Sequence, residues 1–252
     1  GCQYLQFIPI VEPSGIGRHA EGQAVAADHF TAFDAADTAV SSRSVLPEQF
    51  GTFLCDAFDE WIQRDVGRVF VQIFDQALSA WVGVEPSLCV FRRTCGRALA
   101  MEHNGDVYSC DHYVEPDYLL GNLNFVPLED LVNSGRQQEF GDAKLKTLPQ
   151  YCLDCEVRHA CNGECPKNRF LQTPDGTDGL NFLCVGYRKF FNYVDPAMQQ
   201  MAAFVKSRRP AALIMEQHSA TTATDADAPR SGSTPRRNDP CPCGSGKKYK
   251  SC

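Results

Sequence analysis

The chain has 252 residues, of which 43% are hydrophobic and 22% are charged, and its formal net charge is -7. This is the composition of a globular protein with one large domain or two small ones. The acidic balance argues against a nucleic-acid partner, whose binding surface would be basic. The sequence has no apolar run of about 18 residues, which argues against a membrane span.

The first 45 residues predict a strand and a long loop. Residues 4–11 form a short apolar run closed by Pro13, a pattern that predicts a buried strand. Residues 13–45 are rich in Gly, Ala, Ser and Asp, which indicates a loop. The N-terminus carries no initiator Met and no signal peptide, and we expect the chain to be a fragment that begins inside a strand.

A helix, a strand and a second helix are expected next. Pro47 suits the first turn of a helix whose apolar residues recur on one face. Residues 68–73 are β-branched and aromatic, as in a strand, and Asp75 is expected to cap a helix that runs to about Val82. Strands that alternate with helices predict an α/β fold, here the closing units of a parallel barrel over residues 1–85.

Cysteine dominates the middle of the chain. An odd total of 13 cysteines without a secretion signal argues against a disulfide framework. Two complete four-cysteine sites can be made from eight of them, and such sites hold iron–sulfur clusters or structural zinc. Their spacing is Cys89-x5-Cys95-x14-Cys110 and Cys152-x2-Cys155-x5-Cys161-x3-Cys165-x18-Cys184.

A hairpin is predicted within the first run of cysteines, and a helix after the second. Asn104-Gly105 lies between two strand-like runs and favours a type I′ turn, in which both residues have positive φ. This hairpin would bring Cys95 and Cys110 to its open end. Residues 187–205 are aromatic with helical spacing.

The cysteine-rich region resembles a known family. The eight-cysteine spacing is similar to the SPASM domain of radical S-adenosylmethionine (AdoMet) enzymes that modify peptides. Residues 1 to about 205 resemble the anaerobic sulfatase-maturating enzymes, most clearly in four segments: 4–13, 60–83, 86–116 and 151–170. The resemblance implies that residues 1–85 are the C-terminal part of a radical AdoMet (β/α) barrel and that residues 86–206 are a SPASM domain.

The resemblance also implies two interleaved auxiliary [4Fe-4S] clusters. Carried over by position, the ligands of the first are Cys89, Cys95, Cys110 and Cys165, and those of the second are Cys152, Cys155, Cys161 and Cys184. The implied reaction is the oxidation of one Cys or Ser of an unfolded or nascent sulfatase to Cα-formylglycine. It would use AdoMet, a third [4Fe-4S] cluster and an electron donor such as flavodoxin or ferredoxin, in the cytoplasm.

Asp111 is the candidate general base for this reaction. It follows Cys110 directly, and the resemblance implies that it accepts the substrate proton. The alternative is that Asp111 only forms a hydrogen bond in the turn after the hairpin. The chain contains no C-x3-C-x2-C motif for the AdoMet-cleaving cluster, so we expect it to be inactive alone, as a fragment or as a degenerate relative.

The C-terminal 18 residues predict a separate zinc module. Residues 207–234 are expected to form a flexible linker, and residues 235–252 resemble the SEC-C motif. The resemblance implies that Cys241, Cys243 and Cys252 bind Zn²⁺, with a fourth ligand still required. Five basic residues in this module suggest a dock for an acidic partner, and a solvated tail is the alternative.

Two other functions remain open on the sequence. One is a SPASM enzyme that modifies a different peptide. The other is a non-enzymatic adaptor that binds zinc at both cysteine-rich modules. Iron content separates the adaptor from the two enzymes.

Overall fold

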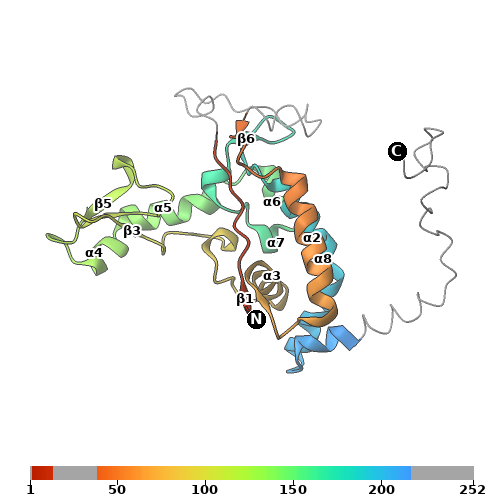
Figure 1. Ribbon diagram of the computed structural model, residues 1–252. Coiled ribbons are helices and arrows are strands. Elements are labelled where there is room, and N and C mark those ends of the chain that lie inside the picture. Colours follow the sequence, from red (N-terminus) through yellow and green to blue (C-terminus); the bar gives the residue numbers. More distant parts are fainter. Residues whose placement is uncertain (1, 14–38, 217–252) are drawn as a thin grey trace, which may run out of the picture. The chain divides into compact units, whose positions relative to one another are not determined.

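The computed structural model describes residues 2–13 and 39–216. Its helices, labelled in Figure 1 where there is room, are α2 (Pro47–Arg64), α3 (Gln72–Val82), α4 (Leu128–Val132), α5 (Gly135–Lys146), α6 (Gln150–Leu153), α7 (Arg158–Cys161) and α8 (Cys184–Lys206). Short 3-10 helices are η2 (Cys89–Phe91), η3 (Pro116–Tyr118), η4 (Pro166–Asn168) and η5 (Ala211–Leu213). The strands are β1 (Tyr4–Leu5), β2 (Phe70–Val71), β3 (Ala100–Met101), β4 (Asp106–Tyr108), β5 (Leu119–Asn122), β6 (Leu171–Gln172) and β7 (Asp178–Leu180).

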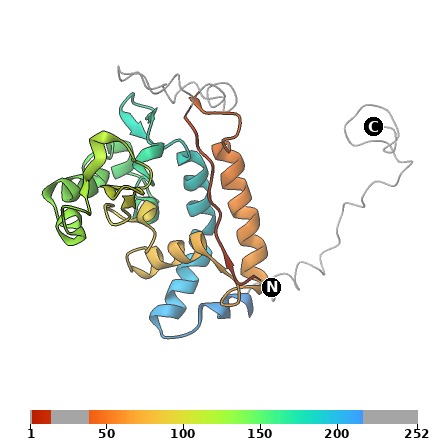
Figure 2. The same cartoon turned by 60° about the vertical axis from the view of Figure 1, so that its left-hand side comes forward.

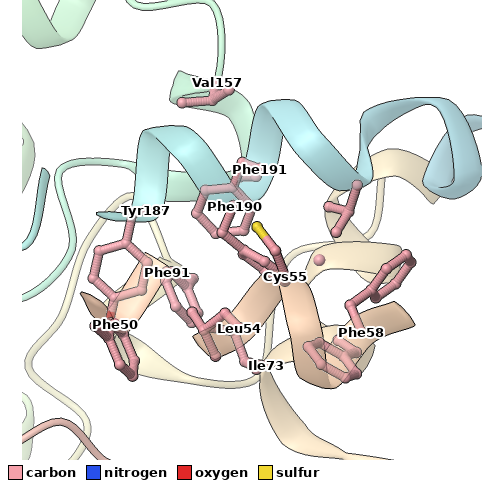
Figure 3. Close-up of a cluster of buried hydrophobic side chains, with 14 of the residues drawn as sticks. Phe50, Leu54, Cys55, Phe58, Ile73, Phe91, Val157, Tyr187, Phe190 and Phe191 are labelled. Carbon is pink, nitrogen blue, oxygen red and sulfur yellow. The ribbon is translucent and has the colours of Figure 1, made fainter. Parts of the chain in front are cut away.

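An aromatic core holds α2, α3 and α8 together (Figure 3). Phe74 of α3 and Phe190 of α8 are fully buried, and their rings stack with centroids 5.7 Å apart. Phe58 of α2 meets Phe74 edge to face at 5.3 Å. The helices predicted from Pro47 and over residues 187–205 are confirmed, because their apolar periodicity produces the faces that pack here.

Two glycines allow α2 and α8 to approach closely. A Cβ on Gly51 would lie 2.7 Å from Gly186 Cα, and a Cβ on Gly186 would overlap the carbonyl oxygen of Pro47. We therefore expect Gly186→Ala to force the helices apart and to lower the free energy of unfolding by about 1–3 kcal/mol. Chemical denaturation measures the change. Gly135→Ala is the matched control, because its Cβ would meet nothing within 4 Å.

Residues 1–85, expected to be part of a barrel, contain a parallel strand pair, β1 with β2, in register Tyr4↔Phe70. Parallel pairing agrees with the α/β class, and the described residues form no closed barrel. The prediction that the first strand is buried is wrong: Tyr4 is 72% exposed and Leu5 39%. Among the described strands β1 pairs only with β2, and the short strand leaves both of its residues exposed.

Two local predictions in this segment also need correction. The strand expected over residues 68–73 is only two residues long, because α3 already begins at Gln72. Asp75 does not cap α3. It lies in the first helical turn, and the N-cap residue Val71 makes no side-chain capping bond.

The predicted hairpin is present as β3 and β4, and β5 adds a third antiparallel strand. Figure 2 shows this region, with α4 and α5, beside the packed helices α2 and α8. Its turn is not type I′, because only Gly105 of the pair has a positive φ, 91°. Asn104 contributes its side chain instead, and its Oδ1 accepts a hydrogen bond from the Asp106 backbone N–H at 3.0 Å.

The compact unit continues to Met215, beyond the expected start of the linker at residue 207. Ile214, just after η5, is fully buried against the aromatic core. The compact unit extends past residue 207 because Ala211, Ala212, Ile214 and Met215 pack against the aromatic core. No helix in the described ranges is long and apolar enough to cross a membrane. The proposed zinc ligands Cys241, Cys243 and Cys252 lie outside the described residues.

Candidate metal centres

The loops that carry Cys95 and Cys110 are fixed by helix α5. Gln137 is buried on this helix, and its Nε2 donates to the carbonyl oxygens of Gly96 at 2.7 Å and Ser109 at 3.0 Å. Gly141 lets the helix approach, since a Cβ there would lie 2.6 Å from Cys95 O. One buried glutamine therefore sets the distance between two cysteine-bearing loops.

The first cysteine group joins residues from four separate places in the chain. Cys89 begins η2, Cys95 follows in the next loop, Cys110 follows β4, and Cys165 precedes η4. Electrostatic interactions link the sulfur of Cys89 to those of Cys95 and Cys165, and Cys165 to Cys110. Each of the four thiols that the resemblance assigns to the first cluster is therefore within electrostatic range of at least one other.

The second cysteine group surrounds a cavity. Cys152, Cys155, Cys161 and Cys184 all line one small, partly open cavity with a volume of about 20 Å³. They come from α6, the turn after it, the end of α7 and the first turn of α8. Four cysteines around one cavity are a donor set that suits a soft metal or an iron–sulfur cluster.

A turn in the left-handed backbone region separates the two groups. Asn162, Gly163 and Glu164 have φ values of 48°, 71° and 51° in succession. Such a run is uncommon for residues with a Cβ. It directs the chain away from Cys161 in the second group and delivers Cys165 to the first. Asn162 Nδ2 holds the turn by donating to Phe91 O at 2.9 Å.

Burial shifts the acidity of these thiols. Desolvation raises the pKa of Cys110, Cys165 and Cys184 to about 12, and it raises that of Cys161 further. These four thiols of the metal-free chain therefore keep their protons at neutral pH, and metal binding must displace them. All eight cysteines are free of disulfides.

Two basic side chains lie beside the cysteines, one of them buried and the other half-buried. Lys144 is 1% exposed, and burial lowers its pKa to about 8, so it stays protonated at neutral pH. Arg169 is half-buried and donates to four backbone carbonyls, among them Lys144 O at 2.7 Å. Sequence reasoning missed both residues and Gln137, because no spacing signal marks a single polar residue that becomes buried by tertiary packing.

Asp111 lies at the surface beside the first group. Its Oδ1 accepts a hydrogen bond from Cys110 Sγ at 3.2 Å, and the side chain is exposed. The ligand atoms of Cys110, Asp111 and His112 all lie within 4.8 Å of one another. His112 Nδ1 is also 3.4 Å from Cys165 Sγ, so these side chains gather at one edge of the first group.

The other residues considered from the sequence lie apart from both groups or at their margin. Cys55 is buried in the aromatic core, and Cys2 is exposed. His103 is 93% exposed on the hairpin. His159 packs its ring against Trp81, with centroids 4.5 Å apart.

Two family models match the chain. An iron–sulfur cluster-binding domain, SPASM, matches residues 89–156, and a SEC-C motif matches residues 237–252. The SPASM match begins at Cys89 and ends before Cys161, Cys165 and Cys184. Cys161 and Cys184 line one cavity with Cys152 and Cys155, and Cys165 interacts electrostatically with Cys89.

Curated relatives and solved structures agree with these matches. A serine-type anaerobic sulfatase-maturating enzyme of Bacteroides thetaiotaomicron is 46% identical, over 85% of this chain and 50% of its own length. A cysteine-type enzyme of Clostridium novyi is 28% identical over 75% of this chain and 45% of its own. The structure of native anSMEcpe with bound AdoMet and Cp18Cys peptide superposes with a TM-score of 0.58 at 28% identity, covering 66% of this chain and 46% of that one. The chain therefore spans about half the length of the relatives it matches.

Proposed function

We propose that this chain, a homologue of the anaerobic sulfatase-maturating enzymes with an iron–sulfur SPASM domain, supplies the auxiliary-cluster part of sulfatase maturation. The observation that supports the proposal is that four of the eight free cysteines line one cavity, while electrostatic interactions link the other four. Each group would hold one [4Fe-4S] cluster. Four-cysteine ligation leaves no open iron position, which suits electron transfer.

The reaction proposed is the oxidation of one Ser or Cys of a sulfatase polypeptide to Cα-formylglycine. Solved structures of the related anSMEcpe contain AdoMet and peptides, which supports a peptide substrate. Bound AdoMet and its cluster would supply the radical that removes a hydrogen atom from the substrate Cβ. Asp111 would accept the proton of the substrate hydroxyl or thiol, at the exposed edge of the first cysteine group.

The chain's share of the chemistry follows from its motifs. The 252 residues contain no C-x3-C-x2-C motif, so we assign AdoMet cleavage to residues outside this sequence. The SEC-C motif is proposed to bind Zn²⁺ through Cys241, Cys243 and Cys252. Flavodoxin or ferredoxin is the proposed electron donor. The cytoplasm is the proposed compartment, because reduced thiols persist there.

A chimaera tests this function. The part of the Bacteroides enzyme that this chain does not cover would be joined to it, because 46% identity favours a compatible junction. With AdoMet and a reductant, the chimaera is expected to convert the Ser of a sulfatase-motif peptide to formylglycine, as read by mass spectrometry. A chimaera that cleaves AdoMet and carries its clusters, yet leaves sulfatase peptides unchanged, would contradict the proposal and favour a different peptide substrate.

A further inference from the structure

Lys144 places a buried positive charge against the first cysteine group. Its side chain is 1% exposed, and Nζ donates to the carbonyl oxygens of Cys89 at 2.6 Å and Val90 at 2.7 Å. The ammonium group interacts electrostatically with the sulfur atoms of Cys95 and Cys165. Burying an ammonium group costs free energy unless nearby groups compensate for the lost water. Carbonyl dipoles supply part of that compensation and leave the positive charge in place.

Arg169 places a second charge between the two groups. Its guanidinium donates to Gly163 O at 2.9 Å, Asn162 O at 3.0 Å and Glu164 O at 3.2 Å, the carbonyls of the left-handed turn. The charge interacts with Cys152 and Cys161 of the second group and with Cys165 of the first. Arg169 is thus electrostatically coupled to both cysteine groups, whereas Lys144 is coupled to the first.

One buried carboxylate faces these cations. Glu164 is 4% exposed, accepts hydrogen bonds from Asn181 Nδ2 at 2.6 Å and Asn168 Nδ2 at 3.2 Å, and interacts with both Lys144 and Arg169. One carboxylate against two cations leaves the protein between the groups positively charged. Four thiolates give each cluster a negative charge, and reduction adds another, so this positive region favours the reduced form.

We propose that Lys144 and Arg169 raise the reduction potentials of the two auxiliary clusters, Lys144 that of the first and Arg169 those of both. The inference rests on the proposed function, because it requires a cluster in each cysteine group. In an oxidative reaction, a higher potential makes the cluster a better electron acceptor. The cations would therefore favour transfer of the second substrate electron into the protein.

Redox titration of the reconstituted full chain, followed by electron paramagnetic resonance, tests the proposal. In Lys144→Met, the first cluster is expected to be at least tenfold less reduced at a given applied potential, which is a shift of about 59 mV for one electron. Arg169→Gln is expected to shift both clusters in the same direction. Lys146→Met is the matched control, because Lys146 lies on the same helix with a side chain 68% exposed.

The charge-conserving variant Arg169→Lys separates charge from hydrogen bonding. It should keep both reduction potentials close to those of the unaltered chain, although it loses most of the guanidinium hydrogen bonds to the left-handed turn at residues 162–164. If the neutral variants do not assemble clusters, Arg169→Lys decides: unchanged potentials in this variant support an effect of charge, and lowered potentials overturn the proposal. If Arg169→Lys fails as well, the residue acts by holding the turn and the proposal is overturned.

Unchanged potentials in Lys144→Met and Arg169→Gln, with both clusters assembled, would also overturn the inference while leaving the proposed function intact. Failure of the unaltered chain to assemble any cluster would instead contradict the proposed function itself. The two failures are therefore distinguishable in one set of preparations.

Discussion

Replacing Cys165 with alanine is expected to remove the first cluster and to leave the second in place. Cys165 lies only four residues after Cys161, yet the left-handed turn at Asn162–Glu164 sends it to the other group. Each auxiliary cluster is proposed to be held by four thiolates, so the loss of one should destabilise that cluster and lower the iron content from about eight to about four per chain. Cys161→Ala should give the same loss of iron by removing the other cluster.

Spectroscopy distinguishes the two variants, because the remaining cluster differs between them. The double variant Cys161→Ala with Cys165→Ala should bind almost no iron. Cys2→Ser is the control and should keep about eight irons, since Cys2 is exposed and outside both groups. Interleaved ligation would be contradicted if the double variant kept one cluster, because both cysteines would then serve the same site.

Asp111→Asn is expected to lower the rate of formylglycine formation by the chimaera about 10²- to 10⁴-fold, the range typical of a lost general base. The carboxylate is exposed and lies 3.2 Å from Cys110 Sγ, so a substrate proton could be taken up next to the first cysteine group. An amide cannot accept that proton. Cleavage of AdoMet to 5′-deoxyadenosine should continue, because Asp111 is not proposed to take part in that reaction.

Asp130→Asn serves as the control for this prediction. Asp130 is also an exposed carboxylate of the same domain, on α4. A chimaera with Asp111→Asn that keeps its clusters and its full rate would show that Asp111 only holds the turn. Loss of the first cluster in that variant would instead assign Asp111 to the cluster site.

The elements with strong periodicity were predictable, and the elements set by tertiary pairing were not. Residues 47–64 and 184–206 show one apolar face each, and both form the expected helices. The strand at residues 4–11 has the apolar run of a buried strand. Only Tyr4 and Leu5 of this run form a strand, paired with β2, and both are exposed, whereas Val11 is buried.

The division of the cysteines into two groups also depends on tertiary structure and could not be predicted from spacing. Spacing alone indicated two metal sites, and the division into two sets came from the resemblance. No spacing rule separates Cys161 from Cys165, because the separation depends on three successive positive φ values. The buried Lys144 and the half-buried Arg169 escaped prediction because both residue types are normally exposed.

The central claim is that two iron–sulfur clusters occupy the two cysteine groups. It is tested most directly by measuring iron, acid-labile sulfide and zinc per chain after anaerobic purification and reconstitution. About eight iron and eight sulfide are expected, with zinc confined to the SEC-C motif. Two or three zinc per chain with negligible iron would contradict the account and favour a zinc-binding adaptor.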